Sequence, residues 1–308
     1  MAGITFTNAA EIIRHTDAGW NELDQERFER LLREVVYDGI KDFYPTANGN
    51  WDAAMIQTML AMGVFLDDRA MFQRAVDYTL SDKGNGAIGK YFNEFGECQE
   101  SGRDQAHTQM GLGYLGCAAE IAWKQGVDLY GALDNRLALG FEYTAKYNLG
   151  HEVPYEPYRS HEGRYYYPKI SDDSRGRFSS IYERVYHHYH DRMGLEMPFT
   201  AQVIEKIRPE RWRSSHASWG TLMHAGQPAS QGQISMRLRV RRSSASRTGR
   251  NSSTAASAAM PAARPARAAT ALSASPSRSA RTGPALPWSC PRSTFSTSCA
   301  RFTWQAAA

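Results

Sequence analysis

The 308-residue sequence lacks several features that define whole classes of protein. No apolar run approaches the roughly 18 residues that a membrane-spanning helix needs, so we expect no membrane span. The first residues show no basic segment followed by an apolar one, so no signal peptide is visible. The four cysteines, Cys98, Cys117, Cys290 and Cys299, match no zinc-binding spacing. We expect Cys98 to be a half-buried structural residue, since no histidine–acid set accompanies it.

Acidic residues and lysine are absent from the C-terminal part of the chain. Residues 1–225 carry 24 Lys and Arg against all 32 Asp and Glu, whereas residues 226–308 carry 12 Arg and neither Lys nor acid. The sequence pI of about 8.8 therefore does not indicate nucleic-acid binding by residues 1–225. Beyond residue 225, Ser, Ala, Arg and Pro predominate, and such a segment cannot bury enough apolar surface to offset its ordering entropy.

Two interpretations explain residues 226–308. They form a natural basic tail that binds acidic polymers, or they result from out-of-frame translation of a GC-rich coding region. We favour the second interpretation, because such a translation yields this mixture of Arg, Ala, Ser and Pro. It predicts one globular domain over residues 1–225, truncated near Ala225, followed by a disordered tail.

Apolar residues recur at helical spacing through most of the first 210 residues, which predicts an all-α fold of helical hairpins. The expected helices are Glu22–Tyr44, Trp51–Leu66, Arg69–Leu80, Asp104–Lys124, Leu129–Tyr147, Ser180–Arg192 and Thr200–Ile207. Residues 1–20 are weakly patterned, and no convincing strand alternation is present. The segment Asn148–Phe178 is expected to be a long irregular loop, and its aromatic residues argue against disorder.

Two polar, glycine-containing loops lead directly into apolar helical patterns. Ala47–Asp52 reads A-N-G-N-W-D, and Glu97–Leu115 reads E-C-Q-E-S-G-R-D-Q-A-H-T-Q-M-G-L-G-Y-L. Helix N-termini favour anions, and Asn50 is the expected N-cap of the first helix. Arg103 and His107 share a face if the second helix begins near Asp104. We expect the two loops to meet in one cleft that binds an acidic sugar.

An ordered set of motifs carries a resemblance to a known family. From about residue 44 to 147 it comprises A-N-G-N-W-D-A-A-M, D-D-R-A-M-F-Q-R-A-V-D-Y, S-G-R-D-Q-A-H-T-Q and G-V-D-L-Y. It extends more weakly through R-G-R-F-S-S-I-Y-E-R-V-Y to W-G-T-L at Trp219–Leu222. This order resembles the alginate lyase domain superfamily, the helical-toroid polysaccharide lyases. The resemblance implies an incomplete (α/α) toroid, with further helices missing upstream.

The chain also departs from the family pattern at two positions. Typical alginate lyases of this group carry Asn-Asn-His in the first motif, where this chain has Asn48-Gly49-Asn50. Their second motif places a tyrosine directly before a histidine, where this chain has Ala106 before His107. The sequence is therefore more similar to glucuronan-lyase-like or uncharacterised branches than to typical alginate lyases.

The resemblance implies β-elimination of a uronic acid, which requires neutralisation of the carboxylate, a base for the C5 proton and an acid for the leaving oxygen. Asn48, Asn50, Arg103 and His107 are candidates for neutralisation, and His107 also for the base. Alternatives stay open for each. The asparagines would cap the helix or form a turn, His107 would be a core histidine, and Arg103 would pair with Glu97, Glu100 or Asp104.

The remaining candidates come mostly from the long loop and the helix that follows it. Candidate acid/base tyrosines are Tyr165, Tyr166 and Tyr167 in the loop and Tyr182 and Tyr186 on the helix, and we favour Tyr165 and Tyr182. Candidate substrate-binding residues are Trp51, Gln105, Arg159, Tyr166 and Arg184. The run His187-His188-Tyr189-His190 points in several directions on a helix, so we predict no metal and no cofactor.

Two other functions compete with a lyase. One is a glycoside hydrolase on a similar toroid, which would use two carboxylates from Asp52, Glu94, Glu100 and Asp104. The other is a fragment made inactive by truncation. For the lyase, the expected partner is an anionic polysaccharide of alginate or glucuronan type, without nucleic acid or membrane, and the resemblance implies a periplasmic or extracellular location. The oligomeric state is left open.

Overall fold

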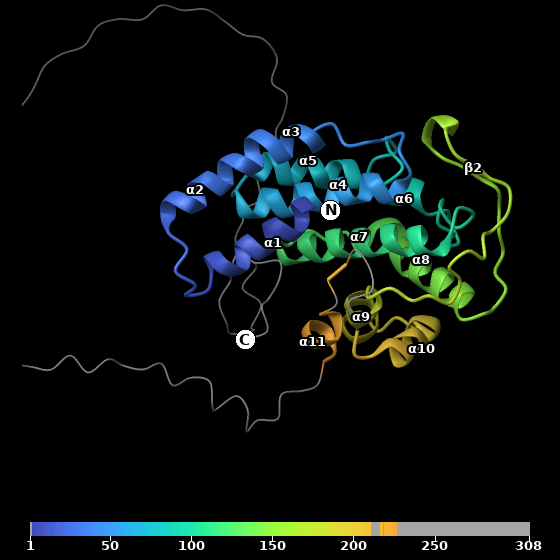
Figure 1. Ribbon diagram of the computed structural model, residues 1–308. Coiled ribbons are helices and arrows are strands. Elements are labelled where there is room, and N and C mark those ends of the chain that lie inside the picture. The colour runs from blue at the N-terminus through green and yellow to red at the C-terminus, as the bar shows by residue number, and fades with distance from the viewer. Residues whose placement is uncertain (1, 211–215, 218, 227–308) are drawn as a thin grey trace, which may run out of the picture. The chain divides into compact units, whose positions relative to one another are not determined.

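The computed structural model describes residues 2–210, 216–217 and 219–226 (Figure 1). Within them the chain is mostly helical, which confirms the all-α prediction. The longer helices are α1 (Ala2–Arg14), α2 (Glu22–Leu31), α4 (Gly49–Phe65), α5 (Arg69–Thr79), α7 (Gln105–Lys124), α8 (Ala132–Asn148) and α10 (Pro198–Ile207). The predicted tail, residues 226–308, lies outside the described residues except for Gly226. The division into a domain and a tail therefore stays a prediction, as does closure of the helices into a toroid.

Shorter elements connect these helices. They are the π-helix η1 (Leu32–Val36), α3 (Tyr37–Ile40), α6 (Ile88–Tyr91), the 3-10 turn η2 (His161–Gly163), α9 (Tyr182–Tyr186), the π-helix η3 (His187–Arg192) and α11 (Gly220–His224). In the long segment after α8, strands β1 (Tyr158–Arg159) and β2 (Tyr166–Tyr167) pair as a small antiparallel hairpin. Two-residue strands are too short to produce a visible alternation, so the sequence did not predict them.

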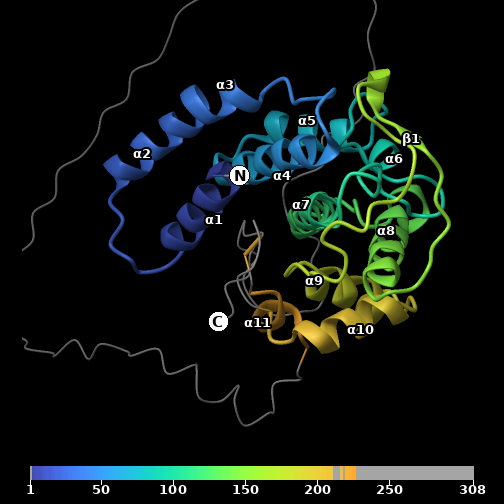
Figure 2. The same cartoon turned by 45° about the vertical axis from the view of Figure 1, so that its right-hand side comes forward.

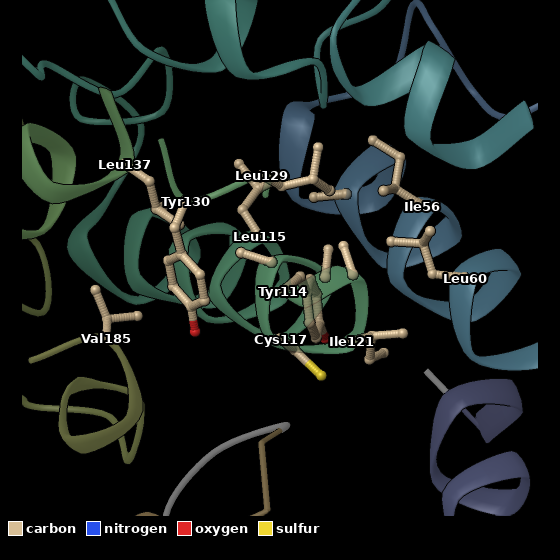
Figure 3. Packing of buried hydrophobic residues seen from close by; sticks show 14 of the residues in the cluster. Ile56, Leu60, Tyr114, Leu115, Cys117, Ile121, Leu129, Tyr130, Leu137 and Val185 are labelled. Carbon is tan, nitrogen blue, oxygen red and sulfur yellow. The ribbon is translucent and has the colours of Figure 1, made fainter. Parts of the chain in front are cut away.

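Helices α4 and α7 lie side by side at the centre of the described helices (Figures 1 and 2). Helix α4 also packs against α1 and α5, while α7 also packs against α8 and α9. Ile56 and Leu60 of α4 are fully buried, as are Leu115 and Ile121 of α7 (Figure 3). Burial of each such side chain contributes about 1.5–3 kcal/mol. An apolar helix such as α4 needs neighbours on most sides, and this packing provides them.

Helix α1 is an element that the sequence analysis missed. It packs on α4, and its buried side combines Ile4 and Ala10 with the polar residues Thr7, Asn8 and Glu11. Because three of these five buried residues are polar, the apolar periodicity is too weak to indicate a helix.

Two smaller predictions were also wrong. The N-cap of α4 is Asn48, and Asn50 already lies in the first helical turn. Cys98 is fully buried, and burial raises its thiol pKa well above the usual range, which excludes a ready thiolate. Among the described helices, none is long and apolar enough to cross a bilayer.

Candidate active site

The N-terminus of α4 meets the β1–β2 hairpin at Asn48. The phenol of Tyr167 donates a hydrogen bond to Asn48 Oδ1 at 3.2 Å. The next residue, Gly49, is buried against the ring of Tyr91, where any Cβ would collide with that ring. Glycine at position 49 therefore lets α4 start close enough to α6 for Asn48 to face the hairpin.

Arg103 connects the two predicted loops. Its Nη1 donates to Glu100 Oε1 at 2.9 Å and to Asn50 Oδ1 at 3.4 Å. Glu100 is fully buried, and its Oε2 accepts hydrogen bonds from the backbone N–H of Asn50 at 2.9 Å and from Tyr91 at 3.1 Å. The side chain of Arg103 is one-quarter exposed. One buried carboxylate thus fixes a guanidinium and the first turn of α4 in a common arrangement.

His107 lies in the first turn of α7, where it is paired with the helix cap. Asp104 is the N-cap, and its Oδ1 accepts the backbone N–H of His107 at 2.7 Å. Its Oδ2 lies 2.6 Å from His107 Nδ1. A carboxylate at Nδ1 favours the tautomer that carries its proton there, which leaves Nε2 unprotonated in the neutral ring. Such a pair suits a general base.

A cavity of about 390 Å³ borders this cluster. Asn50, Trp51 and His107 contribute to its lining. The other lining residues are mostly apolar and come from α1, η1, α3, α4 and α7: Gly3, Val36, Ile40, Ala54, Met55, Thr58, Met110 and Tyr114. Trp51 is 58% exposed, so its indole face is accessible beside the cavity. An exposed aromatic face of this kind can stack on a sugar ring.

Burial shifts the pKa of two groups in the cluster. It raises the pKa of Glu100 to about 7, although Arg103 and the Asn50 N–H favour the charged form. It also raises the pKa of Tyr167, with the nearby Arg103 acting in the opposite direction. Tyr167 therefore keeps its proton at neutral pH, as a proton donor must.

The structure brings four of the predicted site residues together at the N-terminal ends of α4 and α7. Asn50 and Arg103 share a hydrogen bond, Asn50 and His107 line the same cavity, and Asn48 bonds to Tyr167. The catalytic roles assigned to them stay predictions.

Other predicted residues lie elsewhere or serve the fold. Gln105 is buried and donates to the carbonyls of Ser101 and Ser171. Tyr182 is fully buried on α9 and donates to Gln109 at 3.0 Å. Neither reaches the cluster through a contact described above.

The remaining candidates are on the surface or at another cavity. The guanidinium of Arg159 lies 4.3 Å from the ring centre of the exposed Tyr166, and Arg164 stacks on Tyr165 in the same hairpin. Arg184 lines a different cavity, of about 380 Å³, together with residues of α1.

Sequence reasoning missed Asp104 as the partner of His107, and it favoured Tyr165 over Tyr167 as the acid/base. It offered a pair between Arg103 and Glu100 only as the alternative to a functional role, and the structure shows this pair. The D-x-x-H spacing at a predicted helix start could have revealed the Asp104 cap. No sequence signal separates Tyr167 from Tyr165 and Tyr166, because the pairing register of the hairpin decides which ring faces Asn48.

The histidine run on η3 serves local structure. His187 lies between Glu183 at 3.0 Å and Asp191 at 2.5 Å, and His188 stacks on Tyr130. Within the described part of the chain, no three His, Cys, Asp or Glu residues are grouped so that they could hold a metal ion.

Comparison with known proteins gives one family match. The profile of the alginate lyase family matches residues 1–153, which include α1 through α8 and both loops of the cluster. Neither the curated proteins nor the solved structures contain a significant match to the chain.

Proposed function

The chain carries an alginate lyase family domain over residues 1–153, and from this premise we propose that it cleaves a uronic-acid polysaccharide by β-elimination. The family implies polysaccharide lyase activity on uronates. The observation that supports this function best is that Asn50 and His107 line one cavity, while Arg103 bonds to Asn50 and Tyr167 bonds to Asn48 at the same helix end.

Arg103 and Asn50 neutralise the uronate carboxylate in this proposal. Within the described residues, Arg103 uses Nη1 and Nε for its protein partners, so Nη2 can bind a carboxylate oxygen. Among the residues that the structure describes, Asn50 Nδ2 donates only to the sulfur of Met110 at 3.4 Å, a weak acceptor that a carboxylate can replace at little cost. Hydrogen bonds to the carboxylate strengthen as negative charge develops on it, and they lower the barrier to removal of the C5 proton.

His107 and Tyr167 provide the proton transfers. Nε2 of His107 takes the C5 proton while Asp104 orients the ring and stabilises the imidazolium that forms. Tyr167 donates its proton to the glycosidic oxygen as the C4–O bond breaks. The electron pair of the C5–H bond becomes the C4–C5 double bond, and the products are an unsaturated uronate and a new chain end.

The competing hydrolase mechanism needs two available carboxyl groups. Three of the four candidates are already engaged, and the fourth, Glu94, is exposed in the loop after α6. Asp52 is fully buried and accepts hydrogen bonds from the N–H groups of Tyr44 and Gly86 and from the Tyr78 phenol. Glu100 and Asp104 hold Arg103 and His107. These contacts favour the lyase.

The test is incubation with polyglucuronate, alginate and a glycosaminoglycan, followed by the ultraviolet absorbance of unsaturated uronate. We expect absorbance to rise on at least one polymer, and His107→Ala to lower the rate about 10²–10⁴-fold. The matched control is His15→Ala, because His15 is an exposed histidine in the turn directly after α1 that also pairs with a carboxylate, Glu11. Its rate should stay within about twofold of wild type.

Three results would contradict the proposal. New reducing ends without absorbance would indicate the hydrolase, and no change on any polymer would indicate an inactive fragment. Full activity of His107→Ala would exclude His107 from proton transfer.

A further inference from the structure

Asn85 lies in the glycine-rich connection between α5 and α6, and its side chain is fully buried. A buried carboxamide is costly unless its donors and acceptors have partners. Asn85 makes four hydrogen bonds, two through the side chain and two through the backbone, and they reach three separate segments of the chain.

The side-chain bonds reach the two segments that carry Asn48 and Tyr167. Nδ2 of Asn85 donates to the carbonyl of Ala47 at 2.6 Å, directly before Asn48. Oδ1 accepts the backbone N–H of His161 at 2.6 Å, in the turn between the two strands of the hairpin. One amide group therefore bonds to the backbone of both segments that form the Asn48–Tyr167 hydrogen bond.

The backbone bonds of Asn85 extend the same connection. Its N–H donates to the carbonyl of Pro45 at 3.1 Å. Its carbonyl accepts from Nε2 of Gln99 at 2.5 Å, one residue before Glu100, the carboxylate that holds Arg103. The segments that carry Asn48, Glu100 and Tyr167 thus all contact this one residue.

Two neighbouring glycines allow this close approach. A Cβ at Gly86 would lie 2.6 Å from the backbone nitrogen of Ala53, and a Cβ at Gly84 would overlap the Tyr78 phenol. The buried carboxylate of Asp52 accepts the Gly86 N–H at 2.8 Å and fixes the loop against α4. Asn85 is therefore held rigidly, as a residue that positions others must be.

We propose that Asn85 is a positioning residue of the active site, which sets the distance and orientation between Asn48 and Tyr167. This inference rests on the proposed lyase function. Arg103 and Asn50 are held independently by Glu100, so loss of the Asn85 side chain should disturb proton donation more than carboxylate binding.

The first measurement is the kinetics of Asn85→Ala. A displacement of about 1 Å at a reacting group can cost a factor of about 10² in rate. We expect kcat to fall about tenfold to hundredfold while KM changes less than about threefold. The proposal would be overturned if kcat/KM fell by this factor through KM alone, or if kcat of the folded variant were unchanged.

The second variant, Asn85→Asp, is isosteric and adds a pH-dependent readout. An ionised carboxylate keeps the acceptor for the His161 N–H but loses the donor to Ala47. A protonated carboxyl supplies both again. Because burial raises the pKa of the introduced carboxyl, kcat relative to wild type should recover as the pH falls from about 9 to about 6. A constant ratio of the two kcat values across this range would contradict the proposal. This test remains valid even if Asn85→Ala does not fold.

Gln109→Ala is the matched control. Gln109 is an equally buried amide with four side-chain hydrogen bonds, to the Gln105 and Arg177 carbonyls, the Ser179 N–H and the Tyr182 phenol. It should lose similar stability while its kcat stays within about threefold of wild type. A loss of kcat equal to that of Asn85→Ala would show a merely structural effect.

Amide hydrogen exchange separates this inference from the proposed function. At pH about 8, Asn85→Asp should exchange faster than wild type in residues 44–49 and 158–167, whereas Gln109→Ala should do so in residues 177–182. An inactive wild type with this exchange pattern would refute the lyase and keep the positioning role of Asn85. Unchanged exchange in both Asn85 segments would refute that role.

Discussion

Two fully buried glutamates, Glu100 and Glu183, each pair with an arginine, yet their carboxyl pKa values are shifted in opposite directions. Burial raises the pKa of Glu100 to about 7. Burial acts on Glu183 as well, but hydrogen bonds from Arg208, His187 and Thr221 outweigh it and lower that pKa to about 2. The difference lies in the donors that surround each carboxylate.

Glu183 is enclosed by donors on both oxygens. Arg208 binds it in a bidentate way at 2.7 and 2.8 Å, with His187 at 3.0 Å and Thr221 at 2.9 Å. From the described part of the chain, Glu100 accepts hydrogen bonds from only one arginine nitrogen, one backbone N–H and one phenol. Bidentate, charge-assisted pairing stabilises the charged form far more than single contacts do.

The comparison distinguishes a structural clamp, the Glu183–Arg208 pair, from an arginine held ready to bind substrate, the Glu100–Arg103 pair. Glu183 connects α9 to Arg208, at the end of α10, and to α11. Its arginine is used in this structural contact. Arg103 keeps donors for a further anion because Glu100 does not enclose it. The predictions below test this distinction.

The largest effect is expected for Glu183→Gln. A shift of the pKa from 4.5 to about 2 corresponds to about 3 kcal/mol of stability, because Glu183 is fully buried. This contribution is complete above about pH 4.5 and is lost as the pH falls through about 2. Urea unfolding at pH 7 should show this loss, with weaker dependence on acid than wild type. The exposed Glu205→Gln serves as control, and equal stabilities would refute the clamp.

The second largest effect is expected on the reaction rate of Asp104→Asn, in the cluster that contains Glu100 and Arg103. Asparagine caps helices about as well as aspartate, so the free energy of unfolding should change by less than about 0.5 kcal/mol. The rate should fall about tenfold to hundredfold, since the imidazolium of His107 loses its counter-charge. The control is Asp68→Asn, which changes the cap of α5. A rate loss accompanied by an equal loss of stability would remove the distinction between clamp and site.

The smallest effect is expected for the stability of Glu100→Gln as a function of pH. The native state holds the Glu100 proton more tightly than the unfolded chain, so this group stabilises fully below about pH 4.5 and less as the pH rises through about 7. Between pH 5 and pH 8 the variant should gain about 1–2 kcal/mol relative to wild type, after allowance for relaxation of the partly exposed Arg103. Parallel pH curves would contradict a buried, weakly paired Glu100.

Much of the helical framework could be predicted from local patterns. Trp51–Leu66 and Arg69–Leu80 differ from α4 and α5 by one or two residues, because Asp67-Asp68 forms a clear break with Asp68 as cap. Asp104–Lys124 corresponds to α7 in the same way. Local capping chemistry and apolar periodicity determine these boundaries.

The missed features depend on contacts between distant segments. Helix α1 buries polar residues that only its contact with α4 explains. Asn50 and Asn48 are equally good caps by sequence, and the packing of Gly49 against Tyr91 selects Asn48. Tyr167 becomes the site tyrosine only through the register of a two-residue hairpin.

The sequence by itself determined the all-α class, the two loops that lead into helices, and the proximity of Arg103 to His107, because spacing along one chain fixes all three. Only the tertiary structure decided that Asn48 faces Tyr167, that Glu100 holds Arg103 against Asn50, and that Asn85 joins these segments. Those pairings link residues about 40 to 120 positions apart, and packing of whole elements selects them rather than local propensity.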